Sequence, residues 1–149
     1  MAYPVAESRQ IAAPPDKVWA MVSDLPRMGD WSPENVGGEW IKGATGPALG
    51  ALFKGKNRNG FRRWSTTAKV IDCQPGTAFE IAITSFGFHV ASWRYDFEPT
   101  PDGCTVTESW NDKRPVWMKP GSRLMGDHSG AHARQEMAAT LANIAKAAE

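Results

Sequence analysis

The 149-residue sequence contains only two cysteines, and this scarcity excludes several classes of protein. Cys73 and Cys104 are too few for a disulfide framework and too far apart in sequence for a cysteine metal motif. We expect both side chains to be small buried thiols in a reducing compartment.

Long apolar runs and a recognisable secretory leader are also missing. The first ten residues, MAYPVAESRQ, contain no apolar core of the kind that signal peptides have. No apolar segment approaches the roughly 20 residues that a membrane-spanning helix needs. We therefore expect a cytoplasmic protein without integral membrane association.

A strong net charge is absent as well, because 17 basic residues balance 16 acidic ones to give +1 at pH 7. This balance gives no electrostatic reason to expect nucleic acid or an anionic membrane as a partner. One local exception is a basic cluster, for which we favour a solvated hairpin end. Its members are Lys54, Lys56, Arg58, Arg62 and Arg63.

Recognisable catalytic and cofactor motifs are missing too. The sequence holds no glycine-rich phosphate loop, no nucleophile elbow and no plausible Cys–His pair. His128, His132 and Glu136 have an i, i+4, i+8 spacing that suits metal ligands, but helical periodicity turns them toward solvent. We expect no metal and no cofactor, although a kink at Gly126 or Gly130 would turn His128 inward.

Tryptophan, in contrast, is unusually frequent, with seven residues in the chain. So much aromatic surface is typical either of a rigid core or of a cavity wall for an apolar or aromatic ligand. The length and composition, with 42% hydrophobic and 22% charged residues, otherwise suit one soluble globular domain over residues 1–149.

Hydrophobic periodicity predicts seven strands and two helices. Apolar residues from Val18 to Leu25 repeat at helical spacing, so a short helix precedes Pro26. A long terminal helix is expected over 122–148, with Met137, Leu141, Ile144 and Ala148 on its apolar face. The expected strands cover 5–12, 36–42, 51–56, 61–72, 78–84, 88–98 and 104–111, and their short turns indicate antiparallel pairing.

Alternation within the strands places two polar residues, His89 and Glu108, on otherwise apolar faces. His89 is either a histidine at the edge of the core or a hydrogen-bonding or acid–base group in a pocket. Glu108 either forms a structural ion pair with Arg9 or is an unpaired carboxyl whose pKa burial raises.

The segment DLPRMGDWSP, which follows the first helix, combines two prolines and a glycine with apolar residues. Turn residues of this kind belong at the surface, whereas a large indole usually prefers cover. We expect a short, partly helical lid in which Leu25, Met28 and Trp31 face inward. Trp31 should be covered, while Arg27 and Asp30 stay exposed.

These segments together resemble the START/Bet v 1-like (SRPBCC) superfamily, specifically its small bacterial polyketide cyclase/dehydrase-like proteins. The resemblance implies an α+β helix-grip fold, in which a seven-stranded antiparallel sheet wraps around a long C-terminal helix, with short helices between strands 1 and 2. It also implies a hydrophobic cavity between sheet and helix. The matching segments are IAAPPDKVW (11–19), DLPRMGDWSP (24–33), GALFKGKNR (50–58), RWSTT (63–67) and TVTESW (105–110).

The resemblance implies that the protein binds or carries a hydrophobic, aromatic or lipid-like small molecule, which is the function we favour. The alternatives are a polyketide cyclase/dehydratase-type enzyme that uses His89 and Glu108 in the same cavity, and a solid-core protein that acts through a protein partner. The ligand and the oligomeric state stay open. The residues expected to line the cavity are Met28, Trp31, Trp40, Phe53, Trp64, Ile83, His89, Trp93, Glu108, Trp110 and Leu124.

Overall fold

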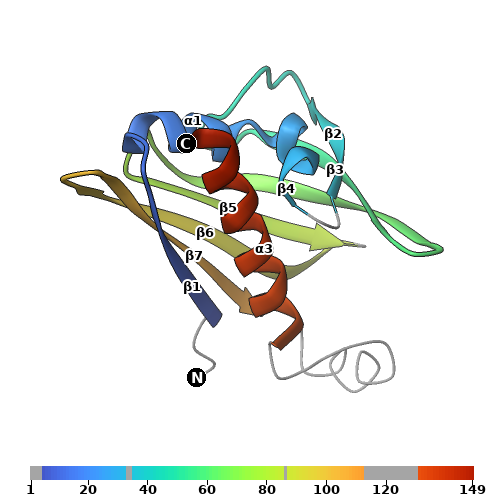
Figure 1. The fold of residues 1–149 in the computed structure, drawn as a ribbon. Helices are drawn as coiled ribbons and strands as arrows, with labels where there is room; N and C mark the ends of the chain where they lie inside the picture. Colours follow the sequence, from blue (N-terminus) through green and yellow to red (C-terminus); the bar gives the residue numbers. More distant parts are fainter. Residues whose placement is uncertain (1–4, 33–34, 86, 113–130) are drawn as a thin grey trace.

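A computed structural model of the chain describes residues 5–32, 35–85, 87–112 and 131–149 (Figure 1). The predicted seven-stranded antiparallel sheet, with a C-terminal helix and short helices after the first strand, is confirmed. No helix among these residues is long and apolar enough to span a membrane. The elements are β1 (Val5–Ile11), α1 (Pro15–Ser23), η1 (Leu25–Asp30), β2 (Asn35–Ile41), β3 (Leu52–Asn59), β4 (Arg62–Gln74), β5 (Ala78–Ser85), β6 (Phe88–Thr100), β7 (Gly103–Asp112) and α3 (Ala131–Ala148).

Local sequence explains how α1 begins and ends. Pro15 stands in the first turn, where its missing N–H costs no helical hydrogen bond, and Asp16 lies near the positive end of the helix dipole. Val18 and Val22 are one turn apart and both are fully buried. The helix ends before Pro26, because proline disfavours helical geometry in the residue that precedes it. The chain then continues as the 3-10 helix η1.

The strand order explains why a helical segment separates β1 from β2. The order is β1-β7-β6-β5-β4-β3-β2, so β1 and β2 occupy opposite edges of one sheet. The chain between them has to cross from edge to edge, and α1 with η1 makes that crossing (Figure 1). From β2 to β7 each strand pairs with the next one in sequence, whereas β1 pairs with the last strand, β7.

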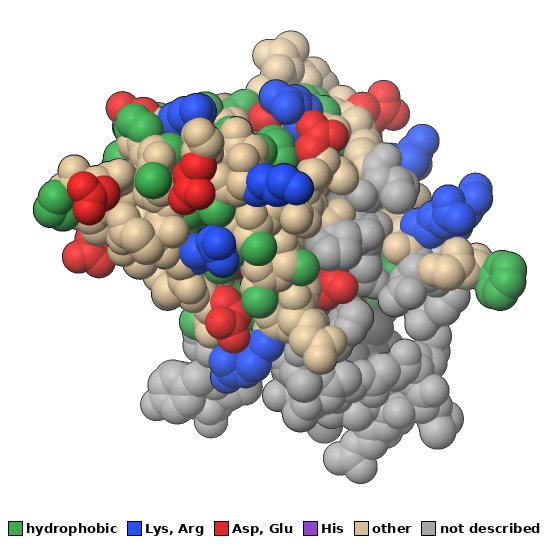
Figure 2. Space-filling view, in the orientation of Figure 1, with side chains coloured by type: hydrophobic (Ala, Val, Ile, Leu, Met, Phe, Trp, Pro, Cys, Tyr) green, Lys and Arg blue, Asp and Glu red, His purple; other side chains and the backbone are tan. Residues whose placement is uncertain are grey.

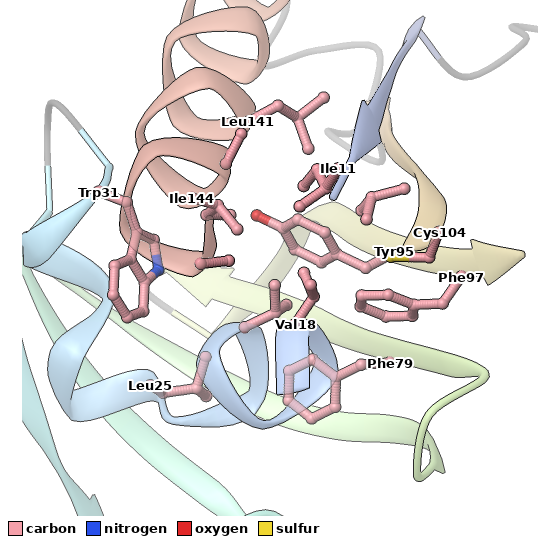
Figure 3. Packing of buried hydrophobic residues seen from close by; sticks show 14 of the residues in the cluster. Ile11, Val18, Leu25, Trp31, Phe79, Tyr95, Phe97, Cys104, Leu141 and Ile144 are labelled. Atoms are coloured by element: carbon pink, nitrogen blue, oxygen red, sulfur yellow. The ribbon is translucent and has the colours of Figure 1, made fainter. Parts of the chain in front are cut away.

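The helix α3 lies across the inner face of the curved sheet (Figure 1) and packs on β1, β7 and α1, whereas η1 packs on β2. The apolar stripe predicted for this helix is confirmed. Figure 3 shows how Leu141 and Ile144 meet the buried residues that the strands and α1 contribute. The stripe residues Met137, Leu141, Ile144 and Ala148 are each at most 3% exposed.

The turn between β6 and β7 packs tightly against the end of β1. A Cβ atom at Gly103 would collide with backbone atoms of Ile11, Ala12 and Ala13, which cannot move aside as a side chain can. We expect Gly103→Ala to lower the free energy of unfolding by about 2–4 kcal/mol in urea denaturation. Gly46→Ala is the control, because no atom lies within 4 Å of its new Cβ. Equal losses in both variants would contradict the tight turn.

Candidate functional site

Inward-facing residues of neighbouring strands stand in rows across the sheet, and the rows differ in burial. Val106 and Phe97 face each other in a row of the solid core and are at most 5% exposed. The next row pairs Glu108 with Tyr95, and both are buried. One row further, half-buried Trp110 faces half-buried Trp93, with ring centroids 6.2 Å apart. Glu108 therefore stands between the solid core and the half-buried tryptophans.

The structure places most of the predicted lining residues on η1 and on the inner face of the sheet. Trp40 and Phe53 pair across β2 and β3 with their rings 5.4 Å apart, edge to face. Leu124 lies outside the described residues. Of the others, Trp31, Phe53 and Glu108 are buried; Met28, Trp40, Ile83, Trp93 and Trp110 are half-buried; Trp64 and His89 are exposed.

The prediction that Trp31 is covered between exposed polar neighbours is confirmed. Trp31 is 3% exposed, whereas the side chains of Arg27 and Asp30 are 61% and 56% exposed and form a salt bridge. The guanidinium of Arg27 lies 5.5 Å from the centre of the indole ring and covers its outer side. The side-chain amide of Asn143 donates to the Trp31 carbonyl at 2.8 Å, which ties η1 to α3.

The indole N–H of Trp31 has no hydrogen-bond partner in the described part of the chain. Figure 3 shows the indole nitrogen directed into the interior beneath α3, on the side of Ile144. The Tyr95 hydroxyl points from the sheet into the same interior (Figure 3). A buried donor that stays unpaired costs about 1–3 kcal/mol, so this N–H is available to an oxygen acceptor that enters.

Glu108 is a buried carboxyl in the middle of an apolar face. Burial raises its pKa from 4.5 to about 8; a hydrogen bond from Tyr95 opposes the shift, and the negative charge of Glu136 adds to it. At neutral pH the carboxyl is therefore mostly protonated and can both donate and accept a hydrogen bond. Its Oε1 atom has no partner among the described residues.

The alternative that paired Glu108 with Arg9 is wrong. Arg9 is exposed and stands opposite Val106, one row away, while Glu7 stands opposite Glu108. Glu7 in turn forms a salt bridge with Arg134 of α3, at 3.5 Å. No described cation therefore neutralises Glu108, and burial controls its pKa.

The expected exposure of Glu136 also needs correction. Helical periodicity placed this residue opposite the apolar stripe of α3. It is half-buried instead, and its charge acts on Glu108. His128 lies outside the described residues. No group of three or more His, Cys, Asp or Glu side chains that could hold a metal ion occurs within 5–32, 35–85, 87–112 and 131–149.

The expectation that His89 faces the interior is wrong. Ile83 pairs with Ala91, but Thr84 pairs with His89, so Val90 is an extra residue in β6. This bulge reverses the alternation and turns His89 to the outer face. Its exposed ring lies there with Nε2 3.1 Å from the hydroxyl of Ser92 and 3.1 Å from the Ala91 carbonyl oxygen.

Tyr95 is the site residue that sequence reasoning missed. Alternation placed it on the apolar face of β6, but only the register of β6 against β7 brings it opposite Glu108. Its phenol pKa is raised well above 10 by burial and by Glu108, so it stays a hydrogen-bond donor over the physiological pH range. The turn at 99–103 joins β6 to β7 and fixes how the two strands pair. Its proline and glycine residues are the sequence signal for this register.

A separate open hollow of about 660 Å³ lies between β2 and β3. Loop residues 41–52 line it, and none of the predicted site residues is among them. The site described above is therefore distinct from this hollow.

Comparison with known proteins identifies the family to which this chain belongs. The chain matches, over residues 4–149, the family described as polyketide cyclase / dehydrase and lipid transport, and it belongs to that family. The resemblance inferred from sequence is therefore confirmed. No curated protein matches the chain.

Solved structures agree with this assignment. The polyketide-cyclase-like protein Cgl2372 from Corynebacterium glutamicum is 32% identical, with a TM-score of 0.57 over 96% of this chain and 85% of that chain. Ara h 8.0201 is 18% identical, with a TM-score of 0.69 over 98% and 97%. The di-domain ARO/CYC protein StfQ from the steffimycin biosynthetic pathway is 13% identical, with a TM-score of 0.73 over 98% of this chain and 50% of its own. The last two likenesses show the helix-grip fold.

The raised pKa of Glu108 predicts that stability depends on pH. The folded chain keeps a proton that the unfolded chain releases between pH 4.5 and about 8, so the free energy of unfolding falls as pH rises through this window. The slope is about 1.4 kcal/mol per pH unit, and the total loss is roughly 5 kcal/mol. We expect Glu108→Gln to remove this part of the decline in urea denaturation at pH 5, 6.5 and 8.

The matched control is Glu39→Gln, which neutralises an exposed carboxyl on β2. This variant should keep the pH dependence of the unchanged protein. If Glu108→Gln showed the same decline as Glu39→Gln, the carboxyl of Glu108 would not carry the buried proton.

Proposed function

We propose that the protein binds a hydrophobic small molecule, with an aromatic or lipid-like body and at least one polar group, between the inner face of the sheet and α3. The observation that carries the proposal is the pair of buried polar atoms without a partner, Trp31 Nε1 and Glu108 Oε1. Native interiors rarely leave such atoms unpaired unless a water, an ion or a ligand satisfies them.

The chemistry of the two atoms narrows the class of ligand. The Trp31 N–H only donates, so it selects a carbonyl, hydroxyl or ether oxygen. Protonated Glu108 accepts a hydrogen bond from a ligand hydroxyl or donates one to a ligand carbonyl. The half-buried faces of Trp40, Trp93 and Trp110 offer an apolar or aromatic body a large contact area.

The relatives support the same class of ligand. The family description includes lipid transport. One neighbour of this fold, StfQ, comes from the pathway that makes steffimycin. The hypothesis of a solid core that acts through a protein partner accounts less well for the site, because a closed core gains nothing from unpaired polar atoms.

A specific observation also favours catalysis as a second candidate function. A pKa of about 8 lets the Glu108 carboxyl exchange a proton near neutral pH, as a general acid or base must. Cyclisation or dehydration next to a carbonyl begins with loss of a proton from carbon. The Glu108 carboxylate would accept that proton, and the Trp31 N–H would stabilise the enolate oxygen. His89 takes no part, since it lies on the outer face.

Removal of one indole N–H tests the binding proposal. We expect Trp31→Phe to weaken the affinity for 1,8-dihydroxyanthraquinone, which carries aromatic rings, carbonyls and hydroxyls, by about 5- to 13-fold. The reason is the loss of one hydrogen bond worth about 1–1.5 kcal/mol. Isothermal titration calorimetry measures this change.

Trp19→Phe is the control for this experiment, because the Trp19 N–H already donates to the Ala78 carbonyl at 2.8 Å. It should lower stability and leave the affinity within about twofold. Equal affinities for Trp31→Phe and the unchanged protein would remove Trp31 from the binding site. Native mass spectrometry of protein purified from its own host would then identify the ligand that co-purifies.

Catalysis and simple binding differ in their response to Glu108→Gln. The amide keeps the shape and much of the hydrogen bonding of the protonated acid but cannot accept a proton. If the protein is an enzyme, we expect turnover of a poly-β-ketone substrate to fall at least 100-fold with affinity within about threefold. Product formation followed by liquid chromatography measures the rate. Unchanged turnover would exclude Glu108 as the base.

A further inference from the structure

The β3–β4 hairpin concentrates positive charge that the rest of the molecule does not share. Between Gly50 and Val70 the sequence holds six basic residues and no acidic residue. The remainder holds the other 11 basic residues and all 16 acidic ones, for a net charge of −5. An anionic surface therefore attracts this hairpin and repels the rest of the molecule, which orients the approach.

The cations of the hairpin gather on one face of its two strands. Alternation along β3 and the register with β4 place Lys54, Lys56, Arg58, Arg63 and Lys69 together on the outer face, and all five are exposed. None of them forms an ion pair with another described residue. Arg58 even stands directly opposite Arg63, an arrangement that destabilises a sheet. A solvated hairpin end explains the exposure but not this repulsion.

The tip of the same hairpin carries a fully exposed aromatic residue. Phe61 is 104% exposed and follows Gly60, whose positive φ of 64° makes the tight turn. Figure 1 shows the hairpin protruding from the body, and Figure 2 shows a hydrophobic side chain at its end with Lys and Arg side chains beside it. Two further aromatic residues are partly exposed away from the tip: Trp64 on β4 is 38% exposed, and Phe88 on β6 is 40% exposed.

We propose that this hairpin docks the protein on an anionic lipid bilayer. Phe61 at the tip enters the boundary between head groups and acyl chains, and the cations behind it bind the head-group phosphates. The inference goes beyond the proposed ligand function and does not depend on it, because these five cations lie on the opposite face of the sheet from α3 and the binding site.

The neighbouring strands favour a bilayer over a nucleic acid. Arg94 on the outer face of β6 is surrounded by three carboxylates, those of Asp72, Glu80 and Asp96, at 2.8–3.0 Å. This surplus of negative charge would repel a polyanion that extended from the hairpin along the sheet. A bilayer that touches only the protruding tip avoids that repulsion.

Vesicle co-sedimentation tests the proposal with the full chain. We expect binding to vesicles of 70% phosphatidylcholine and 30% phosphatidylglycerol at 50 mM NaCl, with little binding to pure phosphatidylcholine and release at 500 mM NaCl. Lys56→Gln/Arg58→Gln should weaken binding about 25-fold, since each cation near an anionic surface contributes about fivefold. Phe61→Ser should weaken it roughly tenfold.

Two controls match these variants in chemistry but lie elsewhere. Arg9→Gln/Lys146→Gln removes two exposed cations from β1 and α3, and Leu49→Ser removes a 73% exposed apolar side chain from the loop before β3. Both should bind vesicles within about twofold of the unchanged protein. Far-UV circular dichroism should show that every variant is folded, since all the substituted side chains are exposed.

Several outcomes would overturn the proposal. They are equal binding to neutral vesicles, equal losses in the hairpin variants and their controls, or no sedimentation with anionic vesicles at 50 mM NaCl. A single-stranded RNA 20-mer that bound more tightly than the vesicles, with the same loss in Lys56→Gln/Arg58→Gln, would assign the hairpin to nucleic acid instead.

Discussion

One helix has to cover the inner face of a seven-stranded sheet that is much wider than the helix. The rest of the structure depends on this mismatch in width. A helix of 18 residues is about 27 Å long and about 10 Å wide, whereas seven strands extend over roughly 29 Å. α3 packs on β1 and β7, so the opposite edge has to be covered by η1. Side chains close the interior well only where the helices reach the strands. Half-buried Trp93 and Trp110 stand one row beyond Glu108, where the closed core ends.

Glu108 stands at the border of these two regions, and desolvation controls its behaviour. In the solid core the sheet supplies apolar partners, whereas here it supplies one phenol, from Tyr95, and α3 adds one repelling charge, from Glu136. A carboxyl in this position is held neutral at the expense of stability at alkaline pH. Proteins accept such a cost at functional sites more readily than in closed cores. The burial of Trp31 with an unpaired N–H is a second cost of the same kind.

The sequence predicted those features that depend on local periodicity. Turn residues marked the strand ends, the apolar stripe of α3 followed from helical spacing, and the cover over Trp31 followed from its placement beside a short helix. Two features depend on pairing between strands and could not be predicted in this way. The extra residue Val90 turned His89 outward, and the register of β7 between β1 and β6 gave Glu108 a phenol instead of Arg9 as its neighbour.

The two halves of the sheet differ in the elements that pack against them, and this difference bears on the proposed function. β1, β6 and β7 are fixed by α1, α3 and a tight turn, whereas β2 is covered by η1 and β3 and β4 continue into a hairpin outside the body of the domain. Opening of the interior costs the least free energy where few apolar contacts are lost. We therefore expect the proposed ligand to enter between η1 and α3 before it displaces α1. The Asn143 bond to the Trp31 carbonyl is the polar contact that such an opening has to break. If the hairpin sits on a bilayer, the more loosely covered half of the sheet is also the half nearest the membrane, which shortens the path of an apolar ligand through water.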